Sequence, residues 1–191
     1  SIGRPILGTI ESISRMRRDK IVDFHRRLYV PENLIVSVAG HVDHDEVVEL
    51  VNKYLKLKNG RSFARINDEP PTIHAFRDVI KRPSEQAHIL IGLPSADFRS
   101  RYKADSFIVN ALLGGGMTSR LYQTVREEKG LVYSIYSQLV TGRDTGVNLV
   151  YASAEPKKTP HVVELILKEI RRLKKDGLKK SELEFFKRQV R

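Results

Sequence analysis

Arg126 and Tyr133 are two side chains whose chemistry and spacing suit the binding of a peptide backbone. Arginine carries a rigid set of N–H donors, and a tyrosine hydroxyl is a neutral O–H donor. Held in place, such donors bind peptide carbonyls and stabilise the oxyanion that forms when a carbonyl is attacked. The same spacing also suits a surface arginine and a packing tyrosine, so spacing alone leaves both interpretations open.

The spacing of the histidines does not indicate a metal-binding site. A zinc-binding helix of the His-x-x-Glu-His or His-Glu-x-x-His type needs two imidazoles on one helix face and a carboxylate. The stretch HVVEL at residues 161–165 begins like the first motif but ends in leucine. His41 and His44 fall in a predicted strand-to-helix turn, where exposed turn and cap residues are the commoner interpretation. The chain has no cysteine, and we predict no metal site in it.

Local signals predict the elements that position Arg126 and Tyr133. Gly114–Gly116 end a predicted helix at residues 101–113, because glycine adopts a left-handed cap at low cost. A P-loop would instead need these glycines after a strand, with a lysine to follow. A second helix, at residues 119–129, ends at Gly130 and carries Arg126 in its last turn. Tyr133 lies early on the next strand, so the glycine turn lets both side chains approach one surface.

The rest of the second half reads as strands and helices. Loose alternation predicts a strand at 74–80, and residues 87–93 read as a central strand. Two strands, 131–139 and 146–154, flank the turn residues of 144–146. Thr159 is predicted to cap a helix that ends at Gly177. Ser181 and Glu184 are predicted to form a capping box at the start of a second helix. Strands grouped with pairs of helices indicate an α+β fold.

The first half contains two predicted helices around one predicted strand. Ser14 is placed to cap a helix at residues 15–28, and the apolar, β-branched run 34–40 predicts a buried strand. Asp43 and Glu46 are spaced as a capping box for the next helix. Residues 56–72, with little periodicity and a Pro70-Pro71 pair, are the candidate linker.

Composition and charge bound the classes of function. The 191 residues carry a net charge of +11, of which residues 1–70 carry +2 and the remainder +9. A basic nucleic-acid-binding module is therefore an alternative, although the sequence shows no interleaved aromatic and basic motif and solvated helix faces explain the charge as well. No apolar run reaches the roughly 18 residues that span a bilayer. We expect neither nucleic acid nor a membrane as partner.

Several stretches together resemble one family. They are GRPILGTIESI at 3–13, FHRRLYVPENLIVSVAGHVD at 24–43, EQAHILIGLP at 85–94 and GGGMTSRLYQTVREEKGLVYSIYS at 114–137. The sequence resembles the pitrilysin/insulinase-type zinc metallopeptidases, inverzincins, in their mitochondrial and bacterial processing-peptidase branch. The resemblance implies an α+β chain that contains the end of a first domain, residues 1–68, and most of a second, homologous domain, residues 73–191, with an antiparallel-rich sheet and helices on one face.

The resemblance also implies functional roles. The family's zinc ligands precede residue 3, so the chain is expected to be an inactive fragment of an enzyme that holds zinc elsewhere. Arg126 and Tyr133 match the family's substrate-binding pair, with Tyr133 also catalytic through the oxyanion; Tyr136 is a rival for that role. A peptide substrate and a homo- or heterodimeric partner chain are implied. The alternative is a non-catalytic partner or respiratory-complex core subunit. The compartment stays open, cytoplasmic or periplasmic if bacterial.

Overall fold

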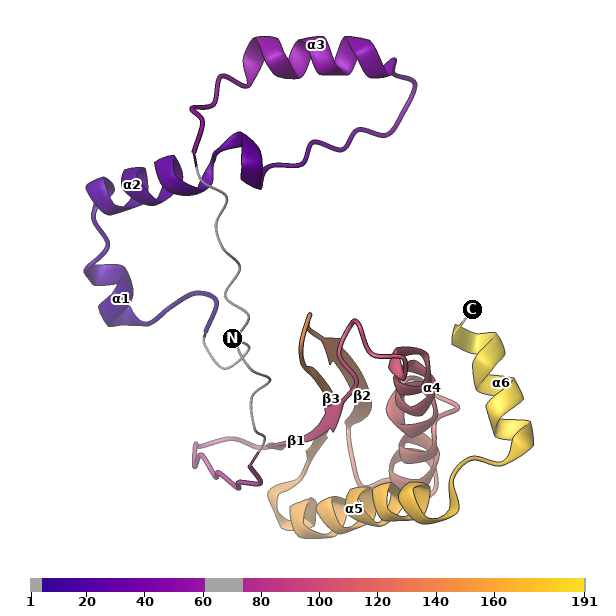
Figure 1. Ribbon diagram of the computed structural model, residues 1–191. Coiled ribbons are helices and arrows are strands. Elements are labelled where there is room, and N and C mark those ends of the chain that lie inside the picture. The colour runs from indigo at the N-terminus through magenta and orange to yellow at the C-terminus, as the bar shows by residue number, and fades with distance from the viewer. Residues whose placement is uncertain (1–4, 61–73, 191) are drawn as a thin grey trace. The chain divides into compact units, whose positions relative to one another are not determined.

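The computed structural model describes residues 5–60 and 74–190, which belong to two compact units, residues 1–68 and 69–191 (Figure 1). The unit boundary falls inside the predicted linker, whose residues 61–72 lie outside the described part. The first unit contains helices α1 (Ile10–Ser14), α2 (Arg18–Leu28) and α3 (His44–Tyr54), with a 3₁₀ turn at Pro31–Asn33. The assignment of the two units to consecutive domains of one family stays a prediction.

The helix starts of the first unit confirm one predicted cap and contradict another. Asp43 caps α3, because its Oδ1 accepts the N–H groups of Asp45 at 2.9 Å and Glu46 at 3.1 Å. This is one half of the predicted box, since the Glu46 side chain does not accept the N–H of Asp43 in return. Ser14 was expected to cap the next helix, but it ends α1. Thr9 and Ser12 form a reciprocal capping box that starts α1 earlier in the chain, and α2 begins only at Arg18.

The strand predicted at residues 34–40 does not form. Residues 34–39 belong to no strand in the described part of the unit, and Ile35 is 94% exposed. A strand needs a neighbour for its backbone N–H and C=O groups, and no described segment of this unit pairs with these residues. Three of the apolar side chains that predicted burial here, Ile35, Val36 and Val38, therefore remain exposed to solvent.

The second unit is built on a three-stranded antiparallel sheet. Strands β1 (Ala87–Ser95), β2 (Ser134–Thr141) and β3 (Gly146–Ala154) lie in the order β1-β3-β2. The prediction that 87–93 form a central strand is therefore wrong, because β3 takes the central place and β1 an edge. Residues 74–80, also predicted as a strand, have no regular structure. An apolar or alternating pattern indicates a strand but not which neighbours it will have.

Helices cover one face of this sheet, as predicted. Helix α4 (Lys103–Gly114) packs against β2, α5 (Thr159–Asp176) against β1, and α6 (Lys180–Val190) against α4 (Figure 1). A cross-strand row, Ile89–Ala152–Ile135, lies in the hydrophobic core. Burial of each of the two isoleucine side chains contributes roughly 1.5–3 kcal/mol. The other members of this core are Leu113, Leu121, Val125, Val132, Val150, Ala154, Val162 and Ile166.

The ends of α5 and α6 differ in detail from the predictions. A 3₁₀ turn at Pro156–Lys158 leads directly into α5, so Thr159 lies inside the helix and its hydroxyl donates to the carbonyl of Glu155. Gly177, with φ +67°, ends α5 as predicted. The Ser181–Glu184 box is wrong: Glu182 accepts the N–H of Lys179 at 2.8 Å. Across the described residues, no helix combines the length and apolar character needed to cross a membrane.

Candidate substrate-binding site

Arg126 lies on a π-helix, not on the α-helical turn that the sequence predicted. The π-helix η2 spans Tyr122–Glu127, and just beyond it the N–H of Glu128 donates to the carbonyl of Gln123, five residues back, at 2.9 Å. Leu121 and Val125 are fully buried in the core and anchor this segment. Short π-helical segments are rare and are found frequently at functional sites.

The Arg126 guanidinium stacks on a neighbouring aromatic ring. Its central carbon lies 5.0 Å from the ring centroid of Tyr122, within the range of a cation–π interaction. Arg126 is exposed and makes no ion pair with any residue of 74–190 that the structure describes. Its N–H donors are therefore oriented by the ring but still available to an incoming carbonyl or carboxylate.

A tight turn at Gly130 connects the π-helix that carries Arg126 with Tyr133. The N–H of Gly130, a residue with φ +58°, donates to the carbonyl of Arg126, and the N–H of Leu131 to that of Val125. The N–H of Tyr133 donates at 2.9 Å to the carbonyl of Ser153 on β3. Its side chain is 58% exposed, so Tyr133 is not a core packing residue. No hydrogen bond or cation–π contact joins the Arg126 and Tyr133 side chains, and their convergence on one ligand stays a prediction.

Tyr136, the rival of Tyr133, belongs to an aromatic group on the face of the sheet opposite the one that α4 and α5 cover. Cross-strand pairing aligns Tyr136 with Tyr151 and Tyr151 with Leu90. The rings of Tyr136 and Tyr151 have centroids 5.0 Å apart, and the Tyr151 hydroxyl is 2.8 Å from Nδ1 of His88. Sequence reasoning did not single out His88 or Tyr151, although strand alternation indicates that both share this face.

Gly114–Gly116 do not form the predicted left-handed cap, and Gly114 has a packing role instead. None of the three has a positive φ, and Gly115, the C-cap of α4, has φ −77°. A Cβ added at Gly114 would lie 2.5 Å from the backbone nitrogen of Ser137 on β2. The glycine therefore permits close contact between α4 and the sheet, next to the hydrogen bond from the Ser137 hydroxyl to the Asn110 carbonyl.

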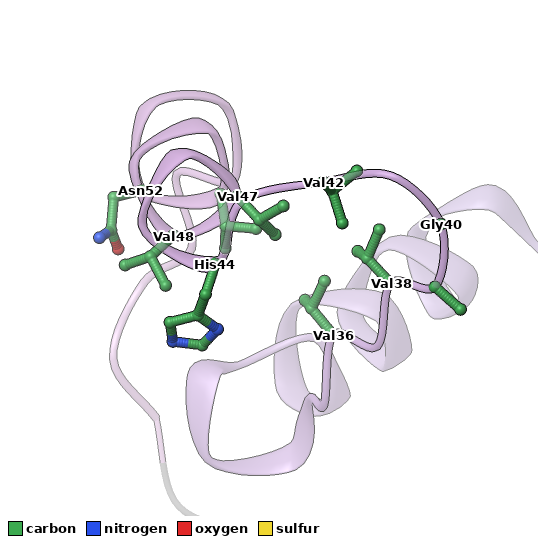
Figure 2. A pocket seen from close by; sticks show the side chains of 10 residues that line it. Val36, Val38, Gly40, Val42, His44, Val47, Val48 and Asn52 are labelled. Carbon is green, nitrogen blue, oxygen red and sulfur yellow. The ribbon is translucent and has the colours of Figure 1, made fainter.

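The first unit contains a hollow of about 460 Å³ near the histidine pair (Figure 2). Most of its lining is apolar and comes from α3 and the segment before it, and His44 is the titratable side chain among the lining residues. His41 does not line it. Within residues 5–60 and 74–190, no three His, Cys, Asp or Glu side chains are grouped so that they could hold a metal ion. The described residues thus do not fit a zinc ion.

An antiparallel sheet covered by helices on one face is the fold that the sequence resemblance implied. Residues 15–190 match the family described as Peptidase M16 inactive domain, and the chain belongs to this family. It is thus a member of the pitrilysin-like metallopeptidase group, within which the matched domain is the inactive one.

Relatives of known sequence carry zinc-protease names. The chain is 37% identical over 201 residues to an uncharacterized zinc protease of Mycobacterium leprae, covering all of this chain and 44% of the relative. It is 32% identical over 191 residues to the uncharacterized zinc protease YmxG of Bacillus subtilis, covering all of this chain and 46% of that protein. The chain therefore spans less than half the length of these curated relatives.

Solved structures share the fold. The crystal structure of a peptidase M16 inactive domain from Pseudomonas fluorescens matches with a TM-score of 0.87 at 23% identity, covering 96% of this chain and 45% of that one. A chain of complex III2 from Candida albicans matches with a TM-score of 0.81 at 20% identity, covering 99% of this chain and 47% of that one. At these identities the likeness concerns the fold alone.

Proposed function

We propose that this chain is the substrate-gripping part of a longer zinc metalloendopeptidase of the processing-peptidase type. Arg126 binds peptide carbonyls, and Tyr133 donates a hydrogen bond to the oxyanion. The observation that carries the proposal is the placement of Arg126. Its guanidinium is stacked on Tyr122 yet free of ion pairs with described residues, and it lies seven residues before an exposed tyrosine that immediately precedes β2. The zinc-protease names of the relatives support the same reaction class.

The two side chains divide the work by charge. The Arg126 guanidinium offers a positive charge and planar N–H donors to carbonyls along an extended peptide. The Tyr133 hydroxyl offers a single, uncharged O–H donor. Such a donor stabilises the negative charge that develops in the transition state more than it stabilises the carbonyl of the bound substrate. This difference is the condition for lowering the activation barrier of hydrolysis.

Zinc belongs to another part of the proposed enzyme. The described residues offer no group of metal ligands, and the curated relatives are more than twice as long as this chain. We therefore place the metal in the remainder of the longer protein or in a partner chain. A homo- or heterodimer would bring such a partner to the Arg126 segment.

The alternative is a non-catalytic partner or core subunit. It is favoured by the inactive character of the matched domain and by the shared fold of a complex III2 chain. The coding sequence upstream of Ser1 separates the two. A His-x-x-Glu-His motif within it supports the enzyme, and its absence supports the non-catalytic subunit.

Peptide hydrolysis by the full-length protein tests the proposal directly. The protein would be incubated with a mixture of internally quenched peptides, with and without a zinc chelator. We expect cleavage that the chelator abolishes and that added zinc restores, and a loss of rate in the Arg126→Ala variant with zinc content unchanged. Full activity of Arg126→Ala on every cleaved peptide would refute the proposed role of Arg126.

A further inference from the structure

Arg120, two residues before the π-helix, is enclosed by carboxylates from two other helices. Its Nε and Nη2 donate to the two oxygens of Glu182 at 3.0 and 2.8 Å, and its Nη1 donates to Glu169 at 3.0 Å. Nη2 also lies 3.5 Å from the carbonyl of Gly177. The single guanidinium thereby connects the start of the π-helix with α5, α6 and the turn between them.

The ion pairs of Arg120 with Glu169 and Glu182 are largely buried, unlike ion pairs on the protein surface. The side chains of Arg120 and Glu169 are 14% and 8% exposed, and that of Glu182 is 26% exposed. Glu169 occupies the buried stripe of α5 that also contains Val162 and Ile166. A charge at such a position is unfavourable unless it is paired, and removal of one partner of a buried pair is strongly destabilising.

The Arg120 group fixes one side of the segment that carries Arg126. Ser119, whose hydroxyl donates to the Gly116 carbonyl at 2.6 Å, and Leu121 are fully buried on either side of Arg120. The segment then continues without interruption into the π-helix. Core packing holds Ser119 and Leu121, and the two carboxylates hold the residue between them.

We infer that Arg120 is a positioning residue for substrate binding: its ion pairs with Glu169 and Glu182 hold the π-helix in the register that presents Arg126 to the peptide. The inference rests on the proposed function in its last step only. The hold on the π-helix concerns this chain's own structure and is measurable without a substrate.

Amide hydrogen exchange in the full-length protein tests the hold on the π-helix. The variant is Arg120→Met, and the matched control is Arg172→Met, because Arg172 also contacts Glu169, at 3.6 Å, but is 55% exposed. We expect exchange of residues 122–131 to accelerate roughly tenfold or more in Arg120→Met, with the sheet amides unchanged, and no change in the control. Unchanged exchange of residues 122–131 would overturn the inference.

Two further variants keep the test decisive if Arg120→Met loses protection throughout the unit. Glu182→Gln keeps the shape of the group and removes one charge. Faster amide exchange confined to residues 122–131 in this variant supports the inference, whereas unchanged exchange of these residues overturns it. Arg120→Lys keeps the charge, but an ammonium cannot make the forked contact with Glu182. We expect it to behave like Arg120→Met; wild-type exchange in Arg120→Lys would show that charge alone suffices and would overturn the geometric role.

Peptide turnover then tests the link to Arg126. In a double-mutant cycle, Arg120→Met should raise KM in the wild-type background and have little further effect on KM in the Arg126→Ala background. The reason is that both changes remove the same interaction, that of Arg126 with the peptide. Additive effects would show that Arg120 does not act through Arg126. If Arg126→Ala alone has no effect, the proposed function fails, while the exchange result still decides the hold on the π-helix.

Discussion

The guanidinium of Arg126 lies over the ring of Tyr122, 5.0 Å from its centroid, within a single six-residue π-helix. This contact restricts the arginine without using its hydrogen-bond donors on another protein group. A side chain of this length loses up to about 2 kcal/mol of rotamer entropy when it is ordered. Partial ordering by the ring before a ligand arrives reduces the cost of binding.

The Tyr122 ring gives the first prediction. In the proposed full-length enzyme, Tyr122→Leu should raise KM by a few-fold, because a cation–π contact between a partly buried ring and an exposed arginine contributes about 0.5–1 kcal/mol. The matched control is Tyr102→Leu, which removes a similar ring beneath Arg101, 4.7 Å away. Steady-state kinetics on one cleaved peptide measures both variants, and equal KM values would show that the ring plays no part in binding.

Tyr133→Phe should lower kcat by roughly 10²-fold or more, the usual effect of removing one oxyanion donor. The side chain is exposed, so zinc content and unfolding midpoint should stay unchanged. Tyr136→Phe is the matched control on the face opposite α4 and α5. A loss of kcat in Tyr136→Phe, with Tyr133→Phe fully active, would transfer the catalytic role to Tyr136.

Gly114→Ala should destabilise the second unit by about 1–3 kcal/mol, because the new methyl group would lie against the backbone of Ser137. This loss should outweigh the gain of about 1 kcal/mol that alanine brings to a helix. Gly116→Ala is the control: its nearest neighbour is the Gln189 side chain at 3.7 Å, and we expect a change within about 0.5 kcal/mol. Denaturant unfolding of both variants checks the difference, and equal midpoints would contradict it.

The Arg120 group gives a prediction about pH. The hydrogen bond from Arg120 lowers the pKa of Glu182 below its ordinary value. A carboxylate with a lowered folded-state pKa contributes stability above its unfolded pKa of about 4.3, and this contribution is lost as the pH falls through the folded value. Glu182→Gln should therefore be less stable at pH 7 and lose less stability on acidification.

Denaturant unfolding at pH 7, 5 and 3 measures this dependence on Glu182. Glu184→Gln is the matched control, since Glu184 lies on the same helix, is 59% exposed and contacts Lys187 at 3.3 Å. We expect the control to follow the wild-type protein at each pH. A Glu182→Gln profile parallel to that of the wild type would show that the carboxylate does not contribute in this way.

Local patterns were sufficient to predict the helices α3, α4 and α5 and the hairpin of β2 and β3. They could not predict sheet order, because the pattern of β1 is the same for an edge and a central strand. They also predicted a strand at 34–40, where the described part of the first unit supplies no neighbour. The sequence did not predict the π-helix, because one additional residue in a helical turn leaves no distinct hydrophobic pattern over six residues.

Within the candidate site, the sequence indicated Arg126 and Tyr133 but not Arg120 and its carboxylates. A signal was present at Glu169, which continues the spacing of Val162 and Ile166 along the apolar stripe of α5. An acidic residue at a core position predicts a buried cation nearby. Identifying that cation as Arg120 required the fold, because the two residues are 49 positions apart in the chain.

The strand order β1-β3-β2 has a consequence for synthesis on the ribosome. The central strand, β3, is the last of the three to emerge, so β1 has no hydrogen-bonding neighbour while the 50 residues from Ala96 to Thr145 are translated. At about 5–20 residues per second, this interval lasts several seconds. During this interval the apolar residues of β1 lack β3, the strand whose backbone groups pair with theirs in the folded protein.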